Sequence, residues 1–182
     1  MVDKVVETEV FGRVVSVPYA SKGVGYALFC LRLVMGWILF WGGFSKLIDP
    51  SWSAAGYLAN AVSPANPFVG VFASLAGSAL VDWLVVWGLL LTGLGLLLGL
   101  ATRLCAFFAS IMMMLFWAAA LQGGLFAFLP LEHGFVINEH VLYVMALWGL
   151  SAFGAGHVLG VDGWLAKQSF VKSRSYLRWL LG

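Results

Sequence analysis

Long apolar runs, each about the length of a membrane-spanning helix, dominate this chain. A helix needs about 20 mostly apolar residues to cross the hydrocarbon core of a bilayer. Four stretches meet that requirement, and we expect spans over about residues 25–46, 82–102, 104–122 and 139–159. Lipid offers no partner to a backbone N–H or C=O, so each span must be a helix, and the sequence lacks the alternating segments of a membrane barrel. The pattern predicts an all-α integral membrane protein, a four-transmembrane-helix bundle.

The composition agrees with a lipid environment. Of the 182 residues, 62% are hydrophobic and 10% are charged, and the mean hydropathy is +0.97. Soluble domains carry roughly 45–50% apolar and about 25% charged residues. A soluble enzyme, a disulfide-stapled secreted domain and a disordered tail are therefore excluded. The net charge of +2 implies no nucleic-acid partner.

Basic residues predict the orientation of the bundle. The chain has ten lysines and arginines, and eight of them lie in the two tails or between the second and third spans. Lys46 is the one expected on the opposite side, and Arg32 lies within the first span. The positive-inside rule then predicts a multi-pass protein of the cell membrane with both termini in the cytoplasm. We expect no cleavable signal peptide, because the first 22 residues are polar.

Three segments lie outside the predicted spans of the membrane domain, residues 23–162. Residues 1–22 form a cytoplasmic tail rich in β-branched residues, which predicts a short hairpin or a strand offered to a partner. The long outer loop between the first two spans is almost without charge, so we expect it to fold back on the bundle or to lie at the interface. Residues 163–182 mix cations with aromatic and leucine side chains, which predicts a basic amphipathic helix on the cytoplasmic lipid surface.

Small residues recur along one face of the second predicted span. Gly88, Thr92, Gly95 and Gly99 follow one another at steps of four, three and four. Small side chains on one face of a membrane helix allow a second backbone to approach closely. The spacing predicts a helix contact, not a site of chemistry.

Arg32 is the charged residue that most needs an explanation. It lies about 10 Å inside the end of the first span. An isolated cation at such depth costs on the order of 2.5–3.5 kcal/mol, so the side chain must face the protein and find an anion or carbonyl oxygens. The candidate partners of Arg32 are Asp162 and the carbonyls of residues 154–156. A contact with Asp162 would be a structural ion pair. The alternative role of Arg32 is to bind an anion or a quinone head group.

A second polar cluster lies at the opposite end of the bundle. Lys46 closes the first span, and a Glu-His doublet occurs twice in residues 132–140. Histidine titrates near neutral pH and a lysine attracts an anion, so Lys46 with His133, Glu139 and His140 is a candidate acid–base site.

Two other readings of this cluster remain open. Polar residues also solvate the start of a helix, with Asn138 or Glu139 as the N-cap. Four potential ligands are present, but their spacing matches no specific metal site, so we expect no bound metal.

His157 lies near the inner end of the fourth predicted span. Its ring either reaches out to the interface or donates a hydrogen bond to a quinone carbonyl. The chain contains no Walker A loop, CxxC pair, haem-binding CxxCH or GxSxG elbow. We therefore expect no protein-bound redox cofactor.

Three segments resemble the DoxX/DoxD-like membrane proteins. They are LRLVMGWILFWGGFSKL (31–47), GLLLTGLGLLLGLATRL (88–104) and EHVLYVMALWGLSAFGAGHVLGVDGWL (139–165). The resemblance extends over about residues 25–167. The family usually has an arginine where this chain has His157.

The resemblance implies a reaction. Within the family, a chain of this size resembles the DoxD-type large subunits of thiosulfate:quinone oxidoreductases, which work beside a small DoxA-like subunit. That activity joins two thiosulfates as tetrathionate and passes two electrons to membrane quinone. On this interpretation Lys46 and Arg32 bind the anionic substrate, and Arg32, Trp37, Trp41 and His157 bind the quinone. The alternative is a non-catalytic accessory subunit of a respiratory complex such as a terminal quinol oxidase.

Overall fold

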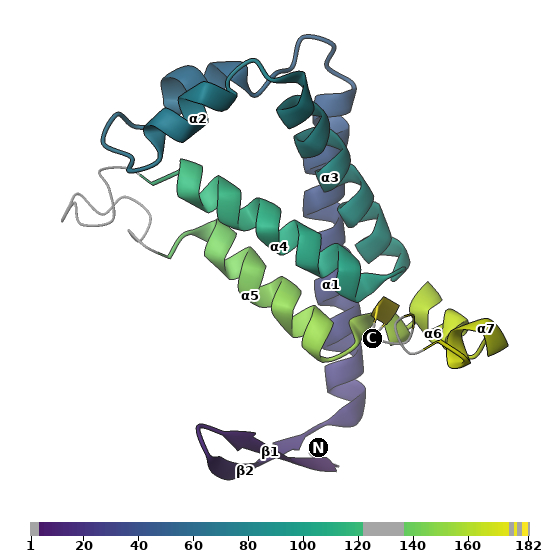
Figure 1. Cartoon of the computed structure of the whole chain (residues 1–182). Coiled ribbons are helices and arrows are strands. Elements are labelled where there is room, and N and C mark those ends of the chain that lie inside the picture. Colours follow the sequence, from purple (N-terminus) through teal and green to yellow (C-terminus); the bar gives the residue numbers. More distant parts are fainter. Residues whose placement is uncertain (1–3, 122–136, 175–176, 178–179, 182) are drawn as a thin grey trace.

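A computed structural model describes residues 4–121, 137–174, 177 and 180–181. The chain begins with a hairpin and continues as helices that are tilted against one another (Figure 1). In order, the elements are β1 (Lys4–Val10), β2 (Arg13–Tyr19), α1 (Ser21–Leu47), the π-helix η1 (Tyr57–Ala61), α2 (Val69–Leu75), α3 (Ala79–Leu98), α4 (Thr102–Ala119), α5 (Glu139–Ala152), the 3-10 turn η2 (Ala155–His157), α6 (Val161–Leu165) and α7 (Ser169–Lys172).

Three of these helices are long and apolar enough to cross a membrane. They are α1, α3 and α4, with 27, 20 and 18 residues. Each contains one of the first three predicted spans or most of it. The helical membrane architecture that the hydrophobic pattern predicted is therefore confirmed for these three segments.

The fourth predicted span is shorter than expected. Helix α5 has 14 residues, a length of about 21 Å against a hydrocarbon core of about 30 Å. It ends at Ala152 because Gly154 adopts a left-handed conformation, with φ +59, and turns the chain into η2. The prediction of one helix through residue 159 is therefore wrong over its last residues.

The predicted C-terminal helix is also interrupted. Up to residue 174 its helices are α6 and α7, and Gln168 between them has an extended backbone, with ψ 142. Helix α6 carries Asp162, which is fully buried. Because this carboxylate is anchored inside the bundle, α6 belongs to the packed protein and is not part of one continuous surface helix.

Helices α1 and α3 lie side by side along much of their length (Figure 1). At Gly93 a Cβ atom would overlap the backbone of Phe40, so only glycine permits this approach. Gly88 and Gly95 of the predicted small-residue face lie instead against side chains of α4. Small residues on α3 thus allow close packing on two sides.

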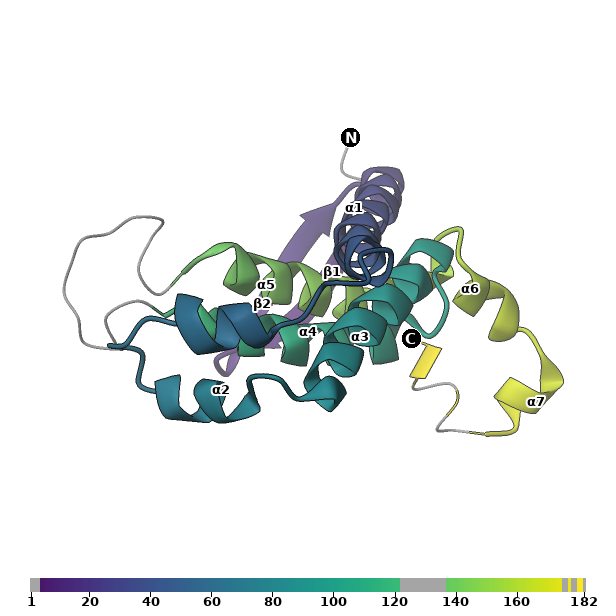
Figure 2. The same ribbon diagram turned by 90° about the horizontal axis from the view of Figure 1, so that it is seen from above.

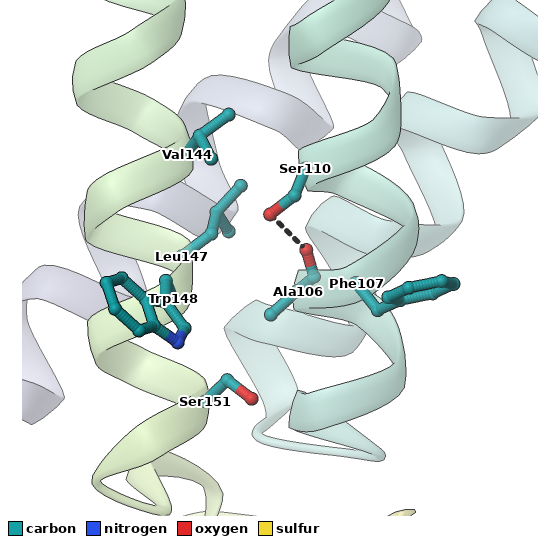
Figure 3. A pocket seen from close by; sticks show the side chains of 7 residues that line it. All are labelled: Ala106, Phe107, Ser110, Val144, Leu147, Trp148 and Ser151. Atoms are coloured by element: carbon teal, nitrogen blue, oxygen red, sulfur yellow. Dashed lines mark hydrogen bonds between the residues drawn. The ribbon is translucent and has the colours of Figure 1, made fainter.

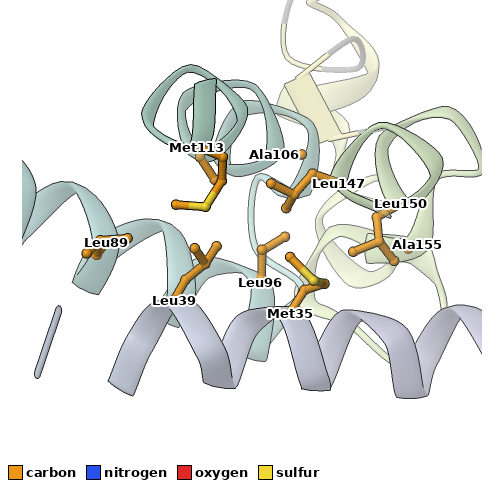
Figure 4. Packing of buried hydrophobic residues seen from close by; sticks show 10 residues of the cluster. Met35, Leu39, Leu89, Leu96, Ala106, Met113, Leu147, Leu150 and Ala155 are labelled. Carbon is orange, nitrogen blue, oxygen red and sulfur yellow. The ribbon is translucent and has the colours of Figure 1, made fainter. Parts of the chain in front are cut away.

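The apolar core joins α1, α3, α4 and α5 with the start of η2 (Figure 4). Its members are aliphatic, methionine and alanine side chains with at most 4% of their surface exposed. They are Met35, Leu39, Leu89, Leu96, Ala106, Ala109, Met113, Leu147, Leu150 and Ala155.

The long connection between α1 and α3 folds back on the bundle, which was one of the two alternatives that its low charge left open. Elements η1 and α2 pack over the C-terminal end of α4, and Figures 1 and 2 both place them there. Leu58, Val62 and Phe72 form a second apolar cluster with Ala119 of α4. An apolar connection is stable here because it has its own contact surface.

The N-terminal tail forms the hairpin that was one of its two alternatives. Strands β1 and β2 pair antiparallel, from Lys4 opposite Tyr19 to Val10 opposite Arg13. The turn between them uses Phe11 and Gly12, both with positive φ, as a tight two-residue hairpin turn requires.

Candidate functional site

The guanidinium of Arg32 is buried at one end of the bundle, where α1 meets the chain that follows α5. Only 1% of Arg32 is exposed. Its Nη1 donates hydrogen bonds to the carbonyl oxygens of Ala155 at 2.7 Å and Val158 at 3.0 Å, and its Nη2 donates to that of Leu159 at 3.3 Å. The carbonyl of Ala155 also accepts the N–H of Val158 at 3.2 Å, and the buried Nε of Arg32 makes no hydrogen bond. The two terminal nitrogens of Arg32 thus supply donors to the turn that follows the end of α5.

Asp162 of α6 is buried in the same region and is fully shielded from solvent. Its carboxylate accepts hydrogen bonds from the backbone N–H groups of Ala101 at 2.6 Å and Thr102 at 2.9 Å. Its own N–H donates to the carbonyl of Gly99 at 2.8 Å. Asp162 therefore caps the N-terminus of α4 from a distant part of the sequence, where the helix dipole favours an anion.

The predicted ion pair between Arg32 and Asp162 is not the contact that the structure makes. Among the described residues, no nitrogen of Arg32 lies within 4.0 Å of an oxygen of Asp162. Each charge contacts backbone groups of opposite partial charge. Arg32 contacts carbonyl oxygens, and Asp162 contacts amide N–H groups. The two charges still attract each other through the interior. We call this region, with its three carbonyls and two amides, the Arg32 end of the bundle.

A hollow of about 370 Å³ opens beside Arg32. The first turns of α1 contribute Lys22, Gly25, Tyr26 and Phe29 to it, and the chain after η2 contributes Val158 and Leu159. The ring of Phe29 lies 5.5 Å from the guanidinium carbon of Arg32.

The residues predicted to bind quinone are not brought into one site. Trp37 and Trp41 lie on the outer surface of α1, 55% and 50% exposed, with their rings stacked at 5.9 Å. Arg32 is enclosed by the protein, and His157 is exposed in η2. Neither tryptophan nor His157 lines the hollow beside Arg32. The helical periodicity of α1 separates them, because the interior face and the lipid face of a helix point in different directions.

The opposite end of the bundle carries Lys46, half-buried at the last turn of α1. Its Nζ donates a hydrogen bond to the carbonyl of Gly42 at 2.8 Å and lies 5.5 Å from the centre of the Trp52 ring. In the turn that follows, Ser51 donates to the Asp49 carboxylate through its N–H and hydroxyl, and these bonds hold the pKa of Asp49 below its usual value.

His140 is the second residue of α5. Asn138 caps the helix, since its side chain accepts hydrogen bonds from the N–H groups of His140 and Val141. Glu139 Oε1 lies 3.7 Å from His140 Nδ1. His133, the third predicted catalytic residue, lies outside the described residues.

The predicted acid–base grouping is not assembled by the described contacts. None of them joins Lys46 to Glu139 or His140. The ring of His140 lies instead near the rings of Phe116 and Tyr143, at 6.1 and 6.4 Å. In the part of the chain that the structure describes, no three His, Cys, Asp or Glu residues are grouped as metal ligands would be.

Asn66 is a buried polar residue that the sequence analysis missed. It is 2% exposed, and its Nδ2 donates to the carbonyls of Ala118, Ala119 and Leu121 at 2.8, 3.2 and 3.0 Å. It thereby caps the C-terminal end of α4. Its position between two prolines in an apolar connection was the available signal, but only the folded connection brings it to α4. We call this region the Asn66 end of the bundle.

A groove of about 280 Å³ runs between α4 and α5. Figure 3 shows Ser110 of α4 and Trp148 and Ser151 of α5 around it, with Val144 and Leu147. Trp148 is 68% exposed, and the Ser110 hydroxyl donates to the carbonyl of Ala106 at 2.7 Å. The groove is an apolar cleft with two hydroxyl groups among its lining residues.

Apolar helices, a core shared by four of them and buried charges held by backbone groups define an integral membrane protein of the helical-bundle class. The chain belongs to the DoxX family, whose model matches residues 27–122 and so includes α2 and α3, all but the first six residues of α1 and the whole of α4. The resembling segment 139–165 lies beyond that match. Comparison with curated proteins and with solved structures gave no match.

Proposed function

We propose that this DoxX-family protein is the quinone-binding membrane subunit of a thiosulfate:quinone oxidoreductase. In this proposal it lies in the cell membrane with both termini in the cytoplasm, α5 and the residues after it complete a fourth span, and a small DoxA-like subunit is its partner. The observation that carries the proposal is the groove between α4 and α5.

The groove has the character of a site for a flat, lipid-soluble ring. Ligand pockets in helical bundles are mostly apolar, with a few polar groups that fix the orientation of the ligand. Trp148 offers an exposed aromatic face for stacking. Ser151 offers a hydroxyl group to a carbonyl oxygen of a quinone, and Ser110 would offer a second one on turning away from the carbonyl of Ala106. A quinone reaches such a groove from the acyl chains without crossing water.

The reaction balances between the two substrates alone. Two thiosulfate dianions lose one electron each and form the sulfur–sulfur bond of tetrathionate, and the quinone takes up the two electrons with two protons to become a quinol. Lys46 is the cation proposed to attract the dianion. His133, Glu139 and His140 are proposed to move protons at the same end, and Arg32 remains a proposed stabilising charge for substrate or quinone.

The test measures quinone reduction and quinone binding separately. The purified full chain, alone and with co-expressed small subunits, is mixed with thiosulfate and decyl-ubiquinone, and quinone reduction is followed by absorbance. A photoreactive quinone analogue is then used to label the protein, and the labelled peptides are identified. Trp148→Ala removes the stacking face, and Trp83→Ala is the matched control because Trp83 is 57% exposed on α3, outside the groove.

We expect labelling of α4 and α5, with weaker labelling and slower turnover at low quinone concentration in Trp148→Ala but not in Trp83→Ala. A stacking contact is worth about 0.5–1.5 kcal/mol, so the apparent KM for quinone should rise about 2- to 12-fold. Equal labelling of both variants would reject the groove as the quinone site. Labelling without turnover under any partner combination would reject the thiosulfate reaction and retain the site.

A second candidate is a non-catalytic accessory subunit of a respiratory complex. The observation that favours it is that Arg32 and Asp162 are occupied by backbone partners, so the most deeply buried charges stabilise the fold. Co-purification with a terminal quinol oxidase, with neither labelling nor thiosulfate-dependent turnover, would favour this function.

A further inference from the structure

The N-terminal hairpin is a surface without a partner in the described chain. Every residue of β1 and every residue of β2 before Tyr19 is exposed. A two-stranded hairpin is at best marginally stable alone in water and needs a surface to pack on. The hairpin also lies outside the segment that defines the DoxX family.

The pairing register separates the charges of the hairpin onto two faces. Val6 pairs with Val17 and Thr8 with Val15, so these side chains share one face. Strand alternation fixes the remaining members. We call the first face the valine face; its members are Lys4, Val6, Thr8, Val10, Arg13, Val15, Val17 and Tyr19. We call the second face the acidic face; its members are Val5, Glu7, Glu9, Val14, Ser16 and Pro18.

Both cations of the two strands thus lie on the face that holds four of their six valines, and both anions lie on the other. This is the arrangement of a surface that meets apolar and anionic groups together. A bilayer with anionic lipids offers that combination, since its surface attracts Lys and Arg while its acyl boundary accepts apolar side chains. Glu7 and Glu9 then face water.

The hairpin starts at the level of the headgroups. The 24 residue steps from Lys22 to Lys46 cover about 36 Å, slightly more than a hydrocarbon core of about 30 Å. Lys22 therefore marks one edge of the bilayer, and only Ala20 and Ser21 separate it from β2. Figure 1 shows the hairpin lying across the end of α1 instead of continuing its line, and Figure 2 shows it extending sideways from that helix.

The tip of the hairpin carries a fully exposed aromatic ring. Phe11 has φ +51, a left-handed conformation that is unfavourable for a bulky side chain. Asn is the usual residue at this turn position. An apolar ring in a place where turn geometry favours Asn is consistent with a contact that the ring makes outside the chain.

We propose that the hairpin docks its valine face on an anionic membrane surface, with Lys4 and Arg13 on lipid phosphates and Phe11 in the acyl boundary. Docking of the hairpin beside α1 therefore depends on the charge of the lipid. This proposal depends on the membrane location of α1 and not on the quinone reaction.

The experiment places a nitroxide label on each face of the full chain in vesicles. Val15→Cys and Ser16→Cys are neighbours on opposite faces and form a matched pair, in a background with Cys30→Ala and Cys105→Ala. Collision of the label with oxygen reports lipid, and collision with a water-soluble nickel complex reports water. Vesicles of phosphatidylcholine alone are compared with vesicles that also contain phosphatidylglycerol. Amide hydrogen exchange of the hairpin in the same two vesicles, on the chain with both native cysteines, is a second measurement.

We expect the Val15→Cys label to be protected from nickel only in the anionic vesicles, and the Ser16→Cys label to stay accessible in both. The ratio of docked to free hairpin should fall about fivefold for each of Lys4→Gln and Arg13→Gln, and should not fall in Glu7→Gln. Slower exchange should likewise require the anionic lipid.

Two results would overturn the proposal. Equal accessibility of both labels, with equal exchange in both vesicles, would mean that the hairpin is free in water. Protection of Val15→Cys in both vesicles, together with dipolar broadening between labels on different molecules, would mean that a second copy of the chain covers the valine face.

Discussion

The two ends of the bundle satisfy helix termini with different kinds of side chain. At the Arg32 end a cation holds three carbonyls after α5, and the carboxylate of Asp162 holds two amides at the start of α4. At the Asn66 end a neutral amide holds three carbonyls at the end of α4. All three side chains are at most 2% exposed.

The difference shows how each end depends on its partners. A buried ion that loses its partners is far more costly than a buried amide that loses them, so the Arg32 end requires all of its members together. The exposed or half-buried charges, Lys46 and Glu139, have no such role. Their contacts are local, because Lys46 donates to the carbonyl of Gly42 in its own helix and Glu139 lies beside His140.

The largest effect is expected from Arg32→Met. Methionine has a similar side-chain length but no charge. The change removes the Arg32 donors from three carbonyls and leaves Asp162 without an opposing charge, so the free energy of unfolding should fall by roughly 3–5 kcal/mol. Thermal unfolding in detergent measures it. Lys22→Met, an exposed site on the same helix, is the control and should change stability little. Equal effects of the two changes would mean that Arg32 has no structural role.

Asp162→Asn should have the next largest effect. The amide keeps one acceptor oxygen, but it loses the charge that α4's N-terminal N–H groups favour, so we expect a loss of about 1.5–3 kcal/mol. Hydrogen exchange should be faster at Ala101 and Thr102 in particular. Unchanged protection of these two amides would contradict the capping role.

Asn66→Ala tests the neutral end. It leaves the carbonyls of Ala118, Ala119 and Leu121 without their donor, and we expect a loss of about 1–3 kcal/mol with faster exchange in η1 and α2. Asn138→Ala, which removes the half-exposed cap of α5, is the matched control and should cost about 1 kcal/mol without affecting η1. If Asn66→Ala were as costly as Arg32→Met, the contrast between the two ends would be lost.

The smallest effect is expected at the exposed turn after α1. Ser51→Ala removes a hydrogen bond to the Asp49 carboxylate, so the pKa of Asp49 should rise toward its usual value. A lowered pKa adds stability at neutral pH that is lost as the pH falls through the pKa of the folded state, and Ser51→Ala should reduce this pH dependence. Carboxyl NMR of labelled aspartate measures the shift. Ser53→Ala should leave the pKa of Asp49 unchanged.

The sequence predicted the parts of the fold that depend on local pattern. Apolar runs located α1, α3 and α4 because a helix in lipid must be apolar along its whole length. The depth of Arg32 predicted that it faces the protein, and Asn138 was one of two predicted caps of α5. The end of α5 was missed because apolar residues continue past it, and the break between α6 and α7 was missed because polar residues at 167–169 also suit the exposed face of a surface helix.

The candidate site was less accessible to sequence reasoning. Of the predicted quinone residues, Arg32 lies on a different face of α1 from Trp37 and Trp41. The groove by Trp148 needs two helices to form. A pattern along one chain gives the spacing of side chains but not the face that a neighbouring helix will cover.

By itself, the sequence determined that lipid is the solvent, which segments are helices in it, and that a cation within them must be neutralised by protein. Only the tertiary structure decided which groups do so. Asp162 binds the start of α4 from 60 residues away in the sequence, and Asn66 binds the C-terminal end of α4 from 52 or more residues away. Such contacts depend on backbone groups left unpaired at helix ends. Every residue type has the same C=O, and every type except proline has the same N–H, so no sequence pattern marks which distant groups will meet.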